Sequence, residues 1–88
     1  YLPSGSIQLV NKSKVEVYIS LQGTTQDGYT TILEYPVNGT IKTNAPAGKY
    51  VYVAWVGGNK LIGKFSLGRL DGIVINIYKD RIEIKAQK

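Results

Sequence analysis

The side chains that most often carry acid–base or metal chemistry are scarce in this sequence. It contains no histidine and no cysteine, which removes the commonest general base and the thiolate ligands. Six carboxylates remain: Glu16, Asp27, Glu34, Asp71, Asp80 and Glu83. Asp27 and Asp71 precede glycines, as in turns, and the others fall at outward or hairpin positions. We therefore expect no catalytic site, no metal and no cofactor, and the chain is predicted not to be an enzyme.

One segment matches part of a known phosphate-binding motif. Gly58–Lys64 fits the first seven positions of the phosphate-binding loop. That motif needs Ser or Thr at its eighth position to hold magnesium, and a helix directly after the loop. Here the eighth residue is Phe65, and the residues from Leu61 to Leu67 alternate as in a strand. The match is interpreted as chance within a hairpin.

Two tripeptides have the form of N-glycosylation acceptors. They are Asn11-Lys12-Ser13 and Asn38-Gly39-Thr40, and both fall at expected turns, where an acceptor asparagine is reachable. Asn11 and Asn38 are therefore candidate glycosylation sites if the chain is exported. Asn38 is also explained by turn chemistry, because Asn-Gly suits a tight hairpin.

Alternation of apolar and polar residues dominates the sequence from end to end. In Val15–Gln22, every second residue from Val15 to Leu21 is apolar, and the alternate positions are Glu16, Tyr18, Ser20 and Gln22. The segment Ile73–Tyr78 repeats the pattern with three isoleucines. A period of two is typical of a strand with one buried face and one wet face.

Six further strands are expected between clear turn signals. Their ranges are Ser6–Asn11, Tyr29–Tyr35, Thr40–Thr43, Lys49–Val56, Leu61–Leu67 and Arg81–Lys85. The turns are rich in Gly, Asn and Asp, and Lys79-Asp80 is short enough to join the last two strands as a hairpin. No segment has helical periodicity. The fold class is therefore all-β: a seven- to eight-stranded antiparallel β-sandwich, with a small β-barrel as the alternative.

The strand Lys49–Val56 differs from the others because both of its faces are apolar or aromatic. Tyr50 and Tyr52 lie on one face, and Val51, Val53 and Trp55 lie on the other. We expect this strand to be central and covered on both sides, with Trp55 as the largest core side chain.

The length of the chain indicates the number of domains, and its charge bears on which partners it could bind. A chain of 88 residues is one domain, residues 1–88, in which residues 1–5 form a candidate extended arm. The net charge is +5, but the eleven basic residues are scattered, which favours a solvated surface over a nucleic-acid site. No apolar run is long enough for a membrane span. The first residue is Tyr1, as in a processed chain or an excised domain.

The stretch Asn44–Val53 contains Pro46-Ala47-Gly48-Lys49-Tyr50, and Gly5–Val10 has the pattern of an opening strand. Both resemble parts of PEGA and carboxypeptidase-regulatory-like domains, although the glycine-rich PEGA consensus is absent. The resemblance implies an immunoglobulin- or transthyretin-like sandwich. It also implies a non-enzymatic adhesion or assembly role on exported or cell-surface proteins.

The leading hypothesis is an extracellular or cell-surface structural module, such as a filament or virion-type subunit, that associates through strand edges. Its partners would be further copies of itself or other surface proteins. The opening segment Tyr1–Gly5 carries no charged side chain and is a candidate arm that adds a strand to a neighbour. The candidate assembly residues are Tyr1, Leu2, Pro3, Ile7 and Leu9.

Two alternatives use the aromatic residues. In the first, a basic β-barrel binds nucleic acid, with Tyr18 and Tyr78 stacking on bases beside Lys79 and Arg81. In the second, a carbohydrate-binding module uses exposed aromatic rings, which requires that Trp55 face solvent.

Overall fold

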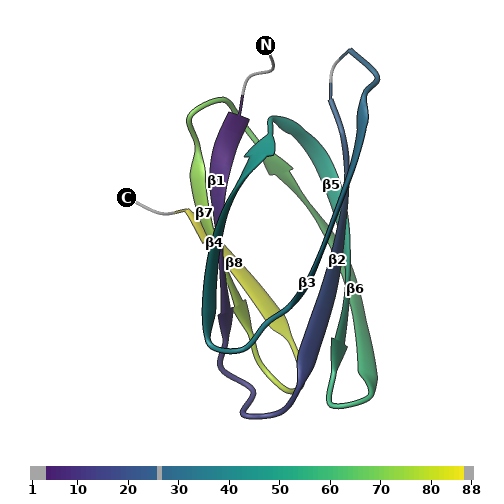
Figure 1. Cartoon of the computed structure of the whole chain (residues 1–88), viewed down its shortest axis with the longest axis vertical. Helices are drawn as coiled ribbons and strands as arrows, with labels where there is room; N and C mark the ends of the chain where they lie inside the picture. Colours follow the sequence, from purple (N-terminus) through teal and green to yellow (C-terminus); the bar gives the residue numbers. More distant parts are fainter. Residues whose placement is uncertain (1–3, 26, 87–88) are drawn as a thin grey trace.

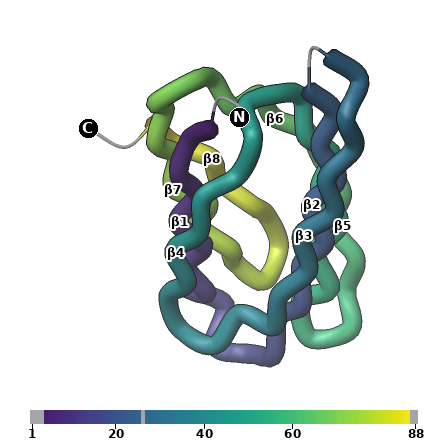
Figure 2. Tube along the Cα trace, turned by 45° about the horizontal axis from the view of Figure 1, so that its top comes forward, coloured from purple at the N-terminus to yellow at the C-terminus, as the bar shows by residue number. Residues whose placement is uncertain are grey.

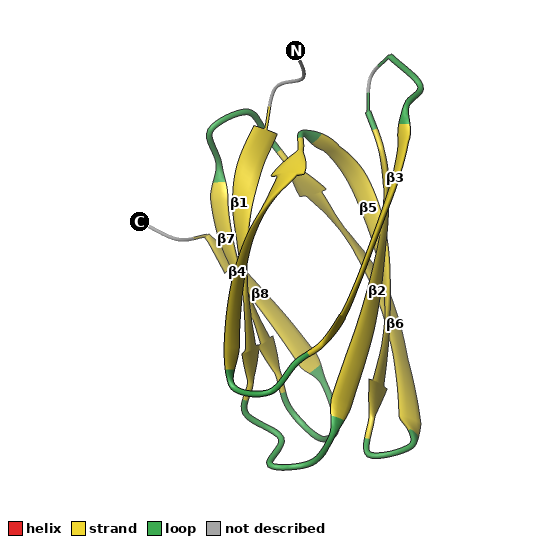
Figure 3. Cartoon of the chain, viewed as in Figure 1, coloured by secondary structure: helices red, strands yellow, loops and turns green. Residues whose placement is uncertain are grey.

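Eight β-strands make up the regular structure of this chain. The computed structural model describes residues 4–25 and 27–86, and these contain no helix (Figure 3). The strands are β1 (Ser4–Asn11), β2 (Val17–Thr24), β3 (Thr30–Pro36), β4 (Thr40–Pro46), β5 (Gly48–Val56), β6 (Asn59–Leu67), β7 (Gly72–Ile77) and β8 (Ile82–Ala86). No helix in the described residues is long and apolar enough to cross a membrane.

The strands form two four-stranded sheets that pack face to face (Figure 1). The first sheet has the order β4-β1-β7-β8 and the second has the order β3-β2-β5-β6. Figure 2 shows the same two layers from another direction. The sandwich prediction is confirmed, and the barrel alternative is wrong because the two sheets have separate edges.

One strand pair departs from the expected antiparallel arrangement. β1 pairs with β7 in parallel, from Ser6 opposite Gly72 to Asn11 opposite Ile77. All the other adjacent pairs in the two sheets are antiparallel. Parallel neighbours need a long crossover connection, and here the whole second sheet and β4 lie between β1 and β7 in the sequence.

The turns occur where Gly, Asn and Asp predict them, but two of them differ in geometry from the expected tight hairpin. Gly57 and Gly58 both have positive φ, at 56° and 91°, and close the β5–β6 hairpin in two residues, as a type I′ turn requires. Asn38-Gly39 does not close a hairpin, because β3 and β4 belong to different sheets. Before Gly72 the positive φ falls on Leu70, at 61°.

The core lies between the sheets and comes from the inward residues of both layers. Ile19 and Leu21 from β2 meet Leu9 and Ile75 from the first sheet in one cluster of buried side chains. The alternation seen in the sequence therefore assigns the inward faces of β2 and β7 correctly. Burial of these aliphatic side chains provides most of the driving force for folding.

Two tyrosines fill the core where the second sheet has glycines. Tyr50 lies opposite Gly23, and Tyr52 lies opposite Gly63. A Cβ atom at either glycine would overlap the facing tyrosine side chain. The Tyr50 ring stacks on Phe65 with centroids 5.2 Å apart, and its hydroxyl donates to the Pro46 carbonyl at 2.6 Å. This bond ties β5 to the end of β4 and so links the two sheets.

Candidate interaction surfaces

The six carboxylates are spread over strands and loops of the chain. Among residues 4–25 and 27–86, no three potential metal-ligating side chains lie together. The Asp71 carboxylate accepts a hydrogen bond from the Gly68 amide at 2.9 Å, which is the local turn role expected of an aspartate.

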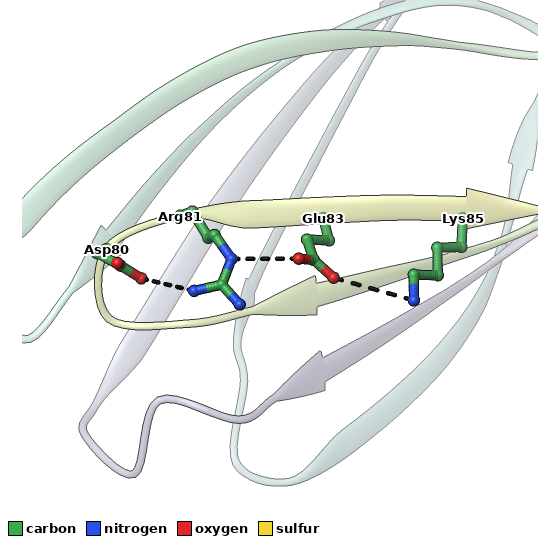
Figure 4. Close-up of polar contacts among 4 residues, drawn as sticks. All are labelled: Asp80, Arg81, Glu83 and Lys85. Atoms are coloured by element: carbon green, nitrogen blue, oxygen red, sulfur yellow. Dashed lines mark hydrogen bonds and ion pairs between the residues drawn. The ribbon is translucent and has the colours of Figure 1, made fainter.

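The densest group of charges lies on the β7–β8 hairpin (Figure 4). Arg81 contacts Asp80 and Glu83, each at 3.1 Å, and Lys85 lies 4.0 Å from Glu83. The hydrogen bond to Glu83, together with the charge of Asp80, raises the pKa of Arg81 above its ordinary value. These exposed pairs contribute little to stability, but they neutralise most of the charge of the hairpin.

This hairpin does not match the predicted nucleic-acid site. The guanidinium of Arg81 lies over the ring of Tyr78, 4.2 Å from its centroid, so that ring face is already occupied. Tyr18 belongs to β2 in the second sheet, whereas Tyr78 follows β7 in the first. The structure therefore does not bring these two tyrosines onto one surface.

Two of the candidate assembly residues lie inside the sandwich. Ile7 and Leu9 lie in the core, with β1 paired to β4 on one side and to β7 on the other. Including these two residues in the arm is wrong, because their side chains face the second sheet. Tyr1, Leu2 and Pro3 lie outside the described residues. Any arm is therefore limited to the residues before Ser4.

The two candidate glycosylation sites have different surroundings. The Asn11 amide nitrogen donates to the carbonyls of Val15 and Val37, at 2.9 and 3.0 Å. Its oxygen accepts from the amide and hydroxyl of Ser13, at 2.9 and 2.6 Å. A glycan on that nitrogen would displace at least one of these bonds. Asn38 is exposed in the loop between β3 and β4, so the structure leaves Asn38 as the accessible acceptor.

The outer face of the second sheet is unusually apolar. Five of its large side chains are exposed, and together they are called the apolar face below: Tyr18, Ile32, Val51, Trp55 and Ile62. Each occupies an outward position of its strand, where an alternating pattern would place polar residues. Contiguous exposed apolar surface usually marks a site of interaction.

Trp55 is the clearest disagreement with the sequence-based expectation. The prediction that β5 is central is confirmed, because β5 lies between β2 and β6. The prediction that both of its faces are covered is wrong, since Trp55 is 41% exposed. Two layers of sheet bury only one face of each strand, and the tyrosine side of β5 faces the core.

Trp55 and Tyr18 border a shallow hollow at one end of the apolar face. They are cross-strand neighbours with ring centroids 6.0 Å apart and planes inclined by 47°. The hollow has a volume of about 440 Å³, and Glu16, Pro36 and Asn38 complete much of its wall. It combines two aromatic rings with a carboxylate and an amide.

Charged residues border the apolar face unequally. Lys60 and Lys64 are exposed on β6, and Lys49 is exposed on β5. At the opposite edge, β3 carries Glu34, whose carboxylate lies 3.5 Å from the Tyr18 hydroxyl. A second hollow of about 710 Å³ lies on the second sheet, and its wall includes Thr30 of β3 as well as Lys49 and Lys64.

The edges of the second sheet also lack strand partners. Within the described part of the chain, β3 and β6 each have a neighbouring strand on one side only. An edge strand presents unpaired backbone N–H and C=O groups that another chain can bond. The exposed Ile32 and Ile62 lie on these two edges, and neither is among the assembly residues predicted from the sequence. The sequence does contain a signal for them, because each of these two strands has an isoleucine at an outward position, where a polar residue is expected.

Comparison of the sequence with models of known protein families and with curated proteins finds no match. The resemblance to PEGA and carboxypeptidase-regulatory-like domains therefore stays a prediction.

Proposed function

We propose that this chain is a non-enzymatic structural module, exported or displayed at a cell surface, that assembles through the free edges of its strands. The observation that carries the proposal is the apolar face of the second sheet, whose exposed side chains come from all four strands, including both edge strands. The lack of histidine and cysteine in the sequence supports a binding role over a catalytic one.

The direct test is the size of the natural chain in solution across a wide range of concentration. Analytical ultracentrifugation and electron microscopy together distinguish a monomer, a closed oligomer and a filament. The average mass of the particles is expected to increase with protein concentration. A strictly monomeric chain at millimolar concentration would contradict the proposal.

The candidate arm has its own test. Deletion of residues 1–10 would remove most of the central strand β1 and unfold the sheet, so it cannot report on an arm. Deletion of residues 1–3 leaves β1 intact. If the arm contributes to assembly, this deletion weakens association, whereas unchanged association would exclude the arm as a contact.

Carbohydrate binding is a second candidate, and the exposure of Trp55 favours it. Sugars are recognised by apolar contact with aromatic rings together with hydrogen bonds to carboxylates and amides, and the hollow beside Trp55 and Tyr18 has both. Because Asn38 lines the same hollow, a glycan on Asn38 would cover it. Glycosylation at Asn38 and sugar binding at this site are therefore mutually exclusive.

A tryptophan fluorescence titration with soluble oligosaccharides tests this candidate. Binding is expected to shift the Trp55 emission to shorter wavelength, and Trp55→Ala or Tyr18→Ala should abolish the interaction measured by calorimetry. Tyr78→Ala is the matched control, because Tyr78 follows a strand of the other sheet. Calorimetry that shows no heat for any oligosaccharide, or equal loss with the control, counts against a sugar site.

A further inference from the structure

We propose that copies of this chain assemble head to tail, with β6 of one copy adding to β3 of the next and so continuing the second sheet. This proposal rests on the proposed assembly function and specifies which strand edges pair and in which register. The partner is a second copy of this chain. The contact is heterologous, because two different edges of the molecule meet.

The strand directions permit this addition. β3 is antiparallel to β2, β2 to β5, and β5 to β6. β3 and β6 therefore run in opposite directions at opposite edges of the sheet. A copy placed beside β6 in the same orientation presents its β3 antiparallel to β6. The alternation of strand directions then continues without interruption across the junction.

The free backbone groups of the two edges also match. The Val37 amide donates to Val17 and the Thr25 amide to Tyr29, so odd-numbered residues of β3 bond toward β2. In an antiparallel ladder, residues alternate between bonding toward one neighbour and toward the other. The even-numbered residues 30, 32, 34 and 36 therefore direct their N–H and C=O groups, where present, away from the sheet.

The same reasoning locates the free groups of β6. The Gly57 amide donates to the Glu16 carbonyl, which places the odd-numbered residues of β5 against β2 and the even-numbered ones against β6. In the β5–β6 register, Tyr52 lies opposite Gly63 and Ala54 opposite Leu61. Residues 60, 62, 64 and 66 of β6 are therefore free to bond a further strand.

One register pairs these free residues by charge and by hydrophobicity at once. It sets Ile32 of one copy opposite Ile62 of the other, Glu34 opposite Lys60, and Thr30 opposite Lys64. Each pair exchanges two backbone hydrogen bonds, or about six in all. A shift that places Glu34 opposite Lys64 moves Pro36 opposite Ile62, and proline has no N–H to donate. A shift by half that amount places Glu34 opposite Ile62.

The two isoleucines at this junction are exposed in the single chain. Ile62 is 62% exposed and Ile32 is 57% exposed, although both lie in strands. On the inward side the same register sets Leu33 opposite Leu61, and both are only partly buried against the core. Cross-strand pairs of branched apolar residues and of opposite charges stabilise antiparallel sheets.

The other edges fit a second copy less well. Pairing β6 with itself at Ile62 would set Lys60 opposite Lys64 twice, and like charges directly opposite each other are destabilising. β8 has five residues and carries the ion pairs of Arg81 and Glu83. β4 ends at Pro46. Because the proposed contact joins different edges, each added copy leaves one edge of each kind free, and the assembly grows as a filament unless the rotation between copies closes it into a ring.

Proline substitutions at the two edges test the geometry. The N–H groups of Ile32 and Ile62 point away from the sheet, so Ile32→Pro and Ile62→Pro each remove no hydrogen bond within the chain. Each variant alone is expected to be monomeric at concentrations where the natural chain assembles. Mixed together, they should form a one-to-one dimer, because one copy retains a free β6 and the other a free β3. Circular dichroism of each variant serves as the check that it is folded.

These variants separate the possible contacts. If Ile32→Pro alone still dimerises, β6 pairs with itself, and if Ile62→Pro alone does, β3 pairs with itself; either result overturns the head-to-tail contact. Folded variants that remain monomeric on mixing also overturn it. If both variants assemble as the natural chain does, the proposed assembly function stands and the β3–β6 pairing is wrong. A natural chain that never assembles removes both proposals.

A charge exchange tests the register without changing the backbone. Glu34→Lys and Lys60→Glu should each weaken association about tenfold, and the double variant should recover most of the loss. Glu16→Lys and Lys42→Glu are matched controls, because both residues are exposed and lie outside the two edges. Equal weakening by the controls, or no recovery in the double variant, would reject this register.

Discussion

The outer faces of the two sheets differ in chemistry although the same alternation builds both. In the second sheet, outward positions carry Trp55, Tyr18 and Ile62, all exposed. In the first sheet, outward positions such as Ser6, Lys42 and Asn44 are polar and line a hollow of about 440 Å³. The inward faces of both sheets are apolar. Burial in the core explains the apolar character of one face of each strand, whereas no other part of the described chain covers the apolar face.

The largest expected effect tests whether the inward faces are equivalent. Ile19→Ala in the second sheet and Ile75→Ala in the first should each lower the free energy of unfolding by about 2–5 kcal/mol, because both side chains are fully buried. Urea denaturation measures the loss. Ile62→Ala is the outward control, and a comparable cost for that exposed residue in the monomer would contradict the assignment of faces.

The next effect tests the close fit between tyrosines and glycines, which the second sheet alone has. Gly63→Ala should cost about 1–3 kcal/mol, because the added methyl group overlaps Tyr52. Gly23→Ala should behave in the same way through Tyr50. Ser66→Ala on the outward side of β6 is the control and should change stability by less than about 0.5 kcal/mol. Thermal unfolding of the three variants decides whether the rings lie against these glycines.

A smaller effect on stability tests the outer faces directly. Val51→Thr in the second sheet and Val74→Thr in the first should each change the free energy of unfolding by less than about 0.5 kcal/mol. Binding of a hydrophobic dye should fall for Val51→Thr, because Val51 belongs to the apolar face. It should not change for Val74→Thr. Equal dye binding by both variants would remove the distinction between the two faces.

The smallest effect at neutral pH concerns the buried tyrosines. Burial raises the pKa of Tyr50 and Tyr52 above the ordinary value of 10.0, so the folded chain holds these protons more tightly than the unfolded chain does. Stability should therefore be unaffected at neutral pH and fall as the pH rises above about 10. Denaturation curves between pH 7 and pH 11 measure this loss. Tyr52→Phe should make it shallower, and an unchanged slope would mean that Tyr52 does not contribute.

For the exposed isoleucines, the sequence predicts the outward position of the side chains but not their location at the edges of a sheet. The alternation places Ile32 and Ile62 outward, and their strands were predicted as Tyr29–Tyr35 and Leu61–Leu67. What the alternation cannot reveal is that these two strands are the edges of one sheet, because edge position depends on which strands pair. The candidate assembly site was therefore assigned to the opening segment instead.

Eight strands, most of their inward faces and the absence of histidine and cysteine chemistry can all be read from the amino-acid sequence. Those features depend on local periodicity and residue type, which need no knowledge of distant parts of the chain. The parallel pairing of β1 with β7, the exposure of Trp55 and the hydrogen bonds that occupy Asn11 become visible in the folded chain alone. Each of these depends on contacts between segments far apart in sequence, and such contacts follow from how two layers share one core.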